Sequence, residues 1–325
     1  GRCPERDLAL LRVTPEGKEV IKSVLPSIPY LSLGESDLVN RADEVLALGY
    51  PLGQASLKST SGVVSGREHI NGRQFIQISS PINPGSSGGP AVNLMGEVIG
   101  IACASITGAQ NVGYIIPVNE LKLILDDLRQ GKLIKKPYLG ILVGPGSKDL
   151  ALYLSNPLPS GCYVMDVFPG GPLDKAGVKA GDMLYAINQM PLDEHGDLQV
   201  PWSEEKISFV DYIARWATGD NVELLIYRNG TAKKIAFKFD QADLSPIKKL
   251  VPGEDVFDYE IFGGMLIQPL SINHIQMLIS GVPTLVKYIE FKNQTAPVLV
   301  VTHVVPGSQL DRLTRIREGT IINVR

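Results

Sequence analysis

The stretch Asn83-Pro84-Gly85-Ser86-Ser87-Gly88-Gly89-Pro90 decides how this chain is interpreted, and it lies between two apolar runs typical of strands, residues 75–78 and 97–102. A turn of glycine, serine and proline folds tightly, because glycine adopts positive φ without the steric cost of a Cβ. A serine at the tip of such a turn is presented as a nucleophile, and the backbone amides beside it are able to bind an oxyanion. Taken alone, the stretch is equally compatible with a loop that has no chemistry.

The surroundings of this turn resemble a known protease family. Residues 77–101 are similar to the nucleophile segment of the HtrA/Deg family, which are chymotrypsin-like serine proteases fused to PDZ domains. That family usually has Gly-Asn-Ser-Gly-Gly in the turn, so Ser87 matches the nucleophile and Ser86 replaces the asparagine. The resemblance implies that the amides of Gly85 and Ser87 form the oxyanion hole.

A second motif lies near the start of the chain. Residues 6–13 form an apolar run between Pro4 and Pro15, which predicts a short buried strand. A lone aspartate such as Asp7 is more often a solvated acid at a strand edge. However, residues 7–11 are similar to the family's segment around the acid of the catalytic triad. The resemblance implies that Asp7 orients a histidine and stabilises its imidazolium form.

The general base is expected to be a histidine, and the chain has four: His69, His195, His274 and His303. In the family the base precedes the acid, and none of the four matches its position. Two accounts stay open: the base lies upstream of Gly1, or the protein is a pseudoprotease. The chain as given is expected to be inactive under either account.

Specificity is predicted from the residues around the expected S1 pocket. Pro81 stands where trypsin-like enzymes carry an acid, so the resemblance argues against a preference for Lys or Arg. Small residues such as Ala102 and Ala104 are expected in the pocket walls. We expect cleavage after small or aliphatic residues, with a broad preference, because one methylene in an apolar pocket discriminates by only about 1–3 kcal/mol.

A helix that resembles the one closing the family's protease domain is predicted over residues 119–129, with Asn119 as its N-cap. A basic linker, residues 132–137, follows. The next residues resemble the loop by which the family's PDZ domain binds a peptide C-terminus, and they are Tyr138, Leu139, Gly140 and Ile141. In such a loop backbone N–H groups capture the carboxylate, and the peptide adds as a strand to a sheet edge.

Two further stretches extend the PDZ prediction. Residues 161–184 carry a strand, a proline turn, a short helix and a Gly-Asp pair, as most PDZ domains of this family do. A second helix is predicted over residues 207–217, where a PDZ domain lines its peptide groove. Residues 299–308 and 317–322 repeat parts of this pattern, which indicates a second PDZ domain cut short at its end. Residues 262–267 are a candidate for its degenerate carboxylate loop.

Composition limits the remaining function classes. The chain has 325 residues, 44% of them hydrophobic, and a net charge of −3, which is typical of a globular protein with two or three domains. No basic excess points to nucleic acid or an anionic membrane. Three scattered cysteines predict neither a disulfide scaffold nor a zinc site. Neither a metal nor a cofactor is expected.

The sequence therefore predicts a mainly β protein: the second half of a chymotrypsin-like β-barrel over residues 1–131, a PDZ domain over 132–245 and an incomplete PDZ-like domain over 246–325. Its expected function is that of an HtrA/Deg-type serine endopeptidase acting on unfolded or damaged proteins, with PDZ domains that bind peptide C-termini. A homo-trimer or larger oligomer is expected, in an extracytoplasmic location such as the bacterial periplasm, or in a plant organelle. The alternative is an inactive pseudoprotease with a chaperone role, or a peptide-binding scaffold.

Overall fold

The chain folds into two compact units. The computed structural model describes residues 1–70, 73–105, 111–131, 133–135, 139–216, 219–239, 245–253, 255–313 and 316–322. The first unit combines Gly1–Pro137 with Asp197–Ala217, and the second combines Tyr138–Gly196 with Thr218–Arg325. Among the described residues, none of the helices has the length and hydrophobicity needed to cross a bilayer.

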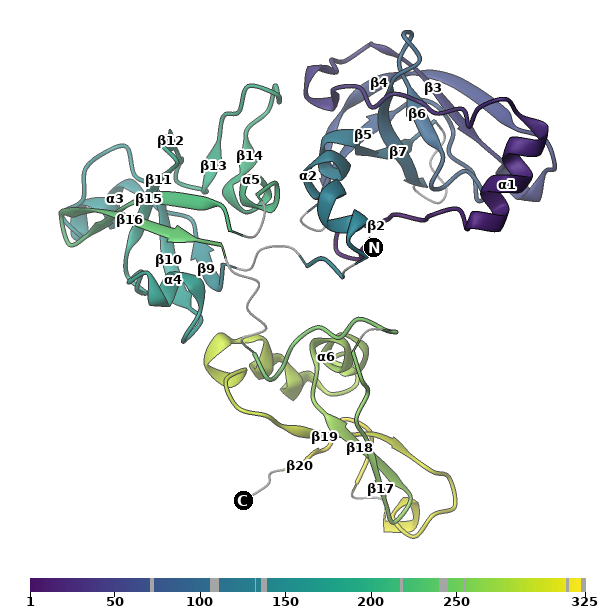
Figure 1. Cartoon of the computed structure of the whole chain (residues 1–325). Coiled ribbons are helices and arrows are strands. Elements are labelled where there is room, and N and C mark those ends of the chain that lie inside the picture. Colours follow the sequence, from purple (N-terminus) through teal and green to yellow (C-terminus); the bar gives the residue numbers. More distant parts are fainter. Residues whose placement is uncertain are drawn as a thin grey trace. The chain divides into compact units, whose positions relative to one another are not determined.

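A closed antiparallel barrel, in the order β3-β4-β5-β8-β7-β6, forms the centre of the first unit (Figure 1). Its strands are β3 (Glu44–Gly49), β4 (Lys58–Ile70), β5 (Arg73–Ile78), β6 (Pro90–Val92), β7 (Val98–Ser105) and β8 (Gly113–Pro117). Alternate residues of β3 point inward, so that Val45 and Ala47 are buried. They join Val64, Ile76, Ile78, Ile99 and Ile115 in a continuous apolar core.

A second apolar cluster lies outside the barrel. It joins Cys3 and Leu8, from the hairpin of β1 (Arg2–Cys3) and β2 (Leu8–Ala9), to Ile124 and Leu128 of helix α2 (Val118–Arg129). The strand predicted over residues 6–13 is therefore reduced to two residues. The chain beyond it is exposed, with Leu11 at 90%, and leads to helix α1 (Pro15–Val24), which buries none of its residues.

The N-terminus of helix α2 corrects one prediction. The helix begins at Val118 with Pro117 in the cap position, and no side chain caps it. Asn119 instead forms two reciprocal hydrogen bonds with the fully buried Ser36. The side-chain Oδ1 of Asn119 accepts from the backbone amide of Ser36 at 3.3 Å, and the backbone amide of Asn119 donates to the Ser36 Oγ at 3.1 Å. This pair ties the helix to the 3-10 turn Ser36–Leu38.

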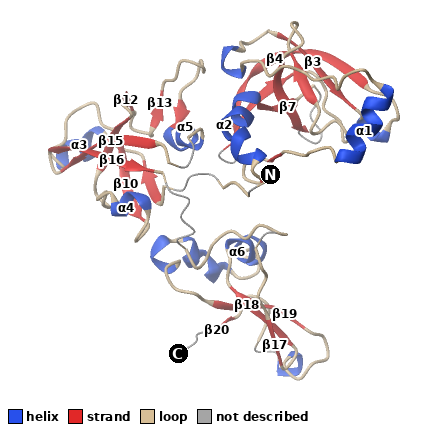
Figure 2. Cartoon of the chain, viewed as in Figure 1, coloured by secondary structure: helices blue, strands red, loops and turns tan. Residues whose placement is uncertain are grey.

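The second unit contains a six-stranded sheet whose main path is β16-β15-β11-β10-β9 (Figure 2). Its strands are β9 (Ile141–Gly144), β10 (Cys162–Val167), β11 (Met183–Ile187), β12 (Met190–Pro191), β15 (Asn221–Arg228) and β16 (Thr231–Lys238). Two short helices accompany them, α3 (Lys148–Tyr153) and α4 (Pro172–Lys175). On two paired strands, β11 and β15, Leu184, Ile187, Val222 and Ile226 are at most 1% exposed and form part of the buried core.

The helix predicted over residues 207–217 is shorter than expected. Ile207–Ser208 form strand β14, paired with β13 (Asp197–Leu198), and the helix α5 spans Phe209–Ala214. The Ser208 side chain accepts a hydrogen bond from the Val210 amide and caps the helix. Although residues 197–217 interrupt the PDZ-like sequence, they belong to the first compact unit.

The last part of the chain forms a sheet in the order β17-β18-β19-β20. Its elements are β17 (Glu260–Phe262), β18 (Met265–Pro269), α6 (Ile272–Leu278), β19 (Leu299–Val304) and β20 (Ile321–Ile322), with 3-10 turns at Pro283–Ile289, Phe291–Asn293 and Asp311–Leu313. Gly263 and Gly264, both at positive φ, make a two-residue hairpin turn between β17 and β18. The candidate second carboxylate loop is thus a tight hairpin, because two consecutive glycines fit such a turn.

Candidate active site

Ser87 lies in the loop between β5 and β6, and glycine conformations shape this loop. Gly85 and Gly88 have φ of 95° and 87°. The Ser86 amide donates to the Asn83 carbonyl at 2.9 Å, and the Gly89 amide donates to the Ser86 carbonyl at 3.0 Å. Among the described residues, the amides of Gly85 and Ser87 have no acceptor, which leaves two backbone donors for a ligand.

The loop packs against residues 50–53, which follow β3. The Leu52 amide donates to the Pro84 carbonyl at 2.7 Å, and Leu52 itself has φ of 57°, which is unusual for a non-glycine residue. A Cβ on Gly85 would lie 2.5 Å from the Tyr50 carbonyl oxygen. Close approach of the two backbones therefore requires glycine at position 85.

The exposed Ser87 side chain is held against β7. Its Oγ donates to the Cys103 carbonyl at 3.0 Å. On either side, the Gly88 amide donates to the Ala102 carbonyl at 2.7 Å, and the Ala102 amide donates to the Gly89 carbonyl at 2.8 Å. The loop that carries the serine is thus fixed to the barrel wall by backbone hydrogen bonds.

Asp7 lies in the turn between β1 and β2, where it has φ of 58°. Its side chain is 62% exposed, and its Oδ2 lies 3.7 Å from Nη1 of Arg73 on β5. The pKa of the Cys103 thiol is raised above its ordinary value, first by burial and then by the negative charge of Asp7, while Arg73 opposes the shift. Asp7 therefore lies near the same residue of β7 whose carbonyl accepts the Ser87 hydroxyl.

Each of the four histidines makes its contacts away from Ser87 and Asp7. His69 Nδ1 lies 2.9 Å from an Asp211 carboxylate oxygen, and His195 Nε2 lies 3.7 Å from Glu194. His274 forms a capping box with Ser271 at the start of α6. His303 Nδ1 lies 2.8 Å from Glu318 Oε1. Ser87 thus contacts the backbone of Cys103, Asp7 acts electrostatically on the thiol of the same residue, and the contacts of the four histidines lie elsewhere.

The residues predicted for the S1 region fall at different places. Pro81 is exposed and lies three residues beyond the end of β5. The side chain of Ala102 is 1% exposed and packs in the barrel core, while its backbone holds the Ser87 loop. Ala104 pairs with Tyr114 across β7 and β8, and its side chain lies outside the described residues.

The predicted carboxylate loop of the PDZ domain is described from Leu139 onward, and Tyr138 lies outside the described residues. Gly140 has φ of 64°, and its carbonyl accepts from the Phe168 amide at 2.8 Å. Ile141 then starts β9, which lies at the end of its sheet. An edge strand next to a turn that requires glycine is the geometry to which an extended peptide adds.

Sequence reasoning missed three contributors to the site. Cys103 offers its carbonyl to Ser87, Arg73 faces Asp7, and Leu52 bonds to the nucleophile loop. The apolar run over residues 97–102 is the signal that could have found Cys103, because it predicts a strand that ends beside this residue. Arg73 and Leu52 carry no comparable signal, because their contacts arise only when separate strands come together.

Comparisons with known proteins agree with this arrangement. Residues 1–101 match the family model of the trypsin-like peptidase domain, and residues 137–239 match that of the PDZ domain. A DegP-like periplasmic serine endoprotease of Brucella suis is 31% identical over 242 residues, which are 72% of this chain and 43% of the relative. The serine protease HhoA of Synechocystis is 33% identical over 208 residues, 59% of this chain and 51% of the relative. The chain therefore spans about half the length of these relatives, or less.

Solved structures give the same result. The HtrA-type protease AlgW with a decapeptide superposes with a TM-score of 0.51 at 26% identity, over 66% of this chain and 65% of AlgW. The predicted mainly β architecture, with a trypsin-like domain followed by a PDZ domain, is confirmed. With both domain models in this order and DegP-like relatives along most of its length, the chain belongs to the HtrA/Deg family of serine proteases.

Proposed function

We propose that the intact protein is a serine endopeptidase that cleaves unfolded or damaged polypeptides. The observation that carries this proposal is the position of Ser87, exposed at the tip of a glycine turn and bonded to the strand near which Asp7 lies. In the proposed reaction the Ser87 Oγ attacks the scissile carbonyl carbon while a histidine takes its proton. The amides of Gly85 and Ser87 stabilise the oxyanion.

The collapse of the tetrahedral intermediate breaks the peptide bond, and the imidazolium gives its proton to the leaving amine. Water then hydrolyses the acyl-enzyme by the same route. Asp7 would orient the histidine. The proposal requires a histidine besides the four in this chain, since their contacts lie elsewhere.

The PDZ domain over residues 132–245 is proposed to bind peptide C-termini at the loop around Gly140 and at the edge of β9. Residues 246–325 are proposed to be a second, PDZ-like domain, since β18, α6, β19 and β20 follow the order of β9, α3, β10 and β11. Whole relatives are named periplasmic proteases, and AlgW was solved with peptides. These names support an extracytoplasmic location and peptide substrates. Assembly into a homo-trimer is proposed on the family resemblance.

Hydrolysis of unfolded casein by the intact natural protein tests the catalytic proposal. We expect cleavage that is lost in Ser87→Ala and kept in Ser86→Ala, a matched control in the same turn. Cleavage that persists in Ser87→Ala would overturn the assignment. A folded protein that cleaves nothing, even with a PDZ-binding peptide added, would instead establish the second candidate, a peptide-binding pseudoprotease. The observation compatible with this candidate is that all four histidines of the chain make their contacts elsewhere.

The peptide site has its own test. Binding of a labelled peptide with a free C-terminal carboxylate is expected to survive Ser87→Ala and to weaken in Gly140→Ala. Gly170→Ala is the matched control, because Gly170 also has positive φ, 74°, with open space around it. Equal binding by both glycine variants would remove the carboxylate loop from its proposed role.

A further inference from the structure

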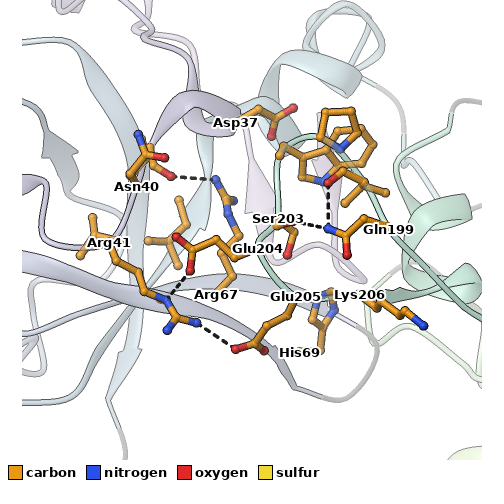
Figure 3. Close-up of a pocket in the computed structure, with 17 residues that line it drawn as sticks. Asp37, Asn40, Arg41, Arg67, His69, Gln199, Ser203, Glu204, Glu205 and Lys206 are labelled. Atoms are coloured by element: carbon orange, nitrogen blue, oxygen red, sulfur yellow. Dashed lines mark hydrogen bonds and ion pairs between the residues drawn. The ribbon is translucent and has the colours of Figure 1, made fainter.

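A cavity of about 300 Å³ lies inside the first compact unit, on the barrel side formed by β4 and residues 37–41. Its other wall is residues 199–206, which belong to the same unit. Figure 3 shows Arg41 reaching Glu204 and Glu205, with Gln199 and Ser203 on the wall opposite the barrel. The proposed chemistry at Ser87 does not use this cavity.

Buried hydrogen-bond donors without partners among the described residues occur in the lining of this cavity and on an arginine packed against the lining. Nη1 of Arg67 and Nε1 of Trp202, two lining residues, are buried and have no partner among the described residues, and the same holds for Nη1 of Arg215. Arg215 lies with its guanidinium carbon 4.3 Å from the centre of the Trp202 ring. All three groups are donors only. Burying such groups without acceptors is unfavourable, so each one points to an acceptor that the protein does not itself supply.

Around Arg67 and Arg215, at the donor-rich end of the cavity, positive charges outnumber negative ones. Nη2 of Arg215 donates to both carboxylate oxygens of Asp37, at 2.9 and 2.7 Å. Nη2 of Arg67 donates to the Ser36 carbonyl at 2.6 Å. The pKa of Arg67 is lowered by burial and by the positive charge of Arg215, while Asp37 raises it. Two arginines thus share one carboxylate, and an additional anion would relieve their repulsion.

The carboxylates at the outer side of the cavity already have partners. Arg41 Nε lies 2.9 Å from Glu204 and its Nη2 lies 2.8 Å from Glu205, and all three side chains are more than half exposed. Asp211 is paired with His69 at 2.9 Å. Glu204 and Glu205 thus face Arg41, and Asp211 faces His69, whereas Nη1 of Arg67 and Nη1 of Arg215 face none of these carboxylates.

We propose that this cavity is a binding site for a small oxyanion, a carboxylate or phosphate group, held by Arg67, Trp202 and Arg215. An oxyanion supplies several acceptors at once, and the planar fork of arginine N–H donors matches a pair of oxygens in either group. Arg67 lies on strand β4, whereas Trp202 and Arg215 belong to residues 197–217. A bound anion therefore strengthens the packing of this segment on the barrel.

The indole resonances provide a direct test in the whole chain. The protein has two tryptophans, so selective ¹⁵N labelling gives two indole N–H signals, from Trp202 and Trp216. Titration with sodium phosphate or sodium acetate is expected to move the Trp202 signal downfield in a saturable way and to leave Trp216 in place. Sodium chloride at the same ionic strength is the control. The tighter of the two titrations identifies the group as phosphate or carboxylate.

Variants then assign the donors by calorimetry with the tighter-binding anion. Trp202→Phe keeps an aromatic ring and removes one neutral donor, so binding is expected to weaken about fivefold. Arg67→Gln removes a charged donor and is expected to weaken binding about tenfold or more. Arg129→Gln, at an exposed arginine of α2, is expected to bind as the unchanged protein does. The proposal is overturned if the Trp202 signal does not saturate, or if sodium chloride moves it as far as phosphate or acetate does. Equal binding of the anion by all three variants would also overturn it.

Discussion

Arg228→Met is expected to destabilise the first PDZ domain by about 3–5 kcal/mol, the range for breaking one side of a buried ion pair. Asp182 is 1% exposed. Its carboxylate accepts from Arg228 Nε at 2.6 Å, from Arg228 Nη2 at 2.8 Å and from the Lys179 amide at 2.8 Å. Methionine keeps most of the arginine stem but leaves the buried charge with a single donor. The loss therefore comes from the uncompensated carboxylate rather than from a cavity.

Hydrogen exchange of the β11 and β15 amides measures this effect locally, because a chain with several domains has no single melting temperature. A loss of this size increases exchange by roughly 10²-fold or more. Lys234→Met is the matched control, since its pair with Glu223 spans 3.6 Å with the lysine side chain 72% exposed, and such pairs contribute about 0–1 kcal/mol. Adding Asp182→Asn to Arg228→Met should restore much of the protection.

Equal exchange rates in Arg228→Met and Lys234→Met would refute this reasoning. The buried carboxylate would then have found another partner or reached water, and the Gly-Asp pair of the PDZ motif would have no role in stability. A double variant that is no better protected than Arg228→Met alone would show that the damage comes from lost packing of the arginine stem.

Three further predictions concern the first unit. Asp7→Asn should speed alkylation of Cys103 by iodoacetamide at pH 8, because losing the nearby negative charge lowers the pKa of the thiol and increases the thiolate fraction; an unchanged rate would contradict the placement of Asp7. Ser36→Ala should weaken protection of the first turn of α2 by about 1–2 kcal/mol, because the backbone amide of Asn119 loses its acceptor; hydrogen exchange of that turn measures the loss. Gly89→Ala should destabilise the nucleophile loop by about 1–3 kcal/mol, because its Cβ would lie 2.1 Å from a carbonyl oxygen of β3; native-like exchange in β6 and β7 would argue against this.

The sequence predicted the parts of the fold that depend on local patterns. The strands of the barrel follow from the alternation of apolar and polar side chains. The turn around Ser87 follows from the conformational freedom of its glycines. Both signals depend only on residues that are neighbours in the sequence. The prediction of a buried strand over residues 6–13 was wrong beyond Ala9, because later apolar residues, including Leu11, are exposed. Asn119 failed as a helix cap because a buried serine distant in sequence binds it instead.

The remaining features depend on contacts between distant segments. No local pattern shows that Arg73 faces Asp7, or that residues 197–217 belong to the barrel's unit. The two-residue turn at Gly263 was also ambiguous, since a glycine pair suits both a hairpin and a carboxylate loop. Family resemblance supplied the role of Ser87, and the structure supplied its hydrogen bond to β7.

The most direct test of the central claim is labelling of the intact natural protein with a fluorophosphonate probe, which reacts with activated serines. The account predicts labelling that disappears in Ser87→Ala and persists in Ser86→Ala. A folded protein that stays unlabelled, with a PDZ-binding peptide present to rule out a resting state, would contradict the protease assignment and leave a peptide-binding scaffold.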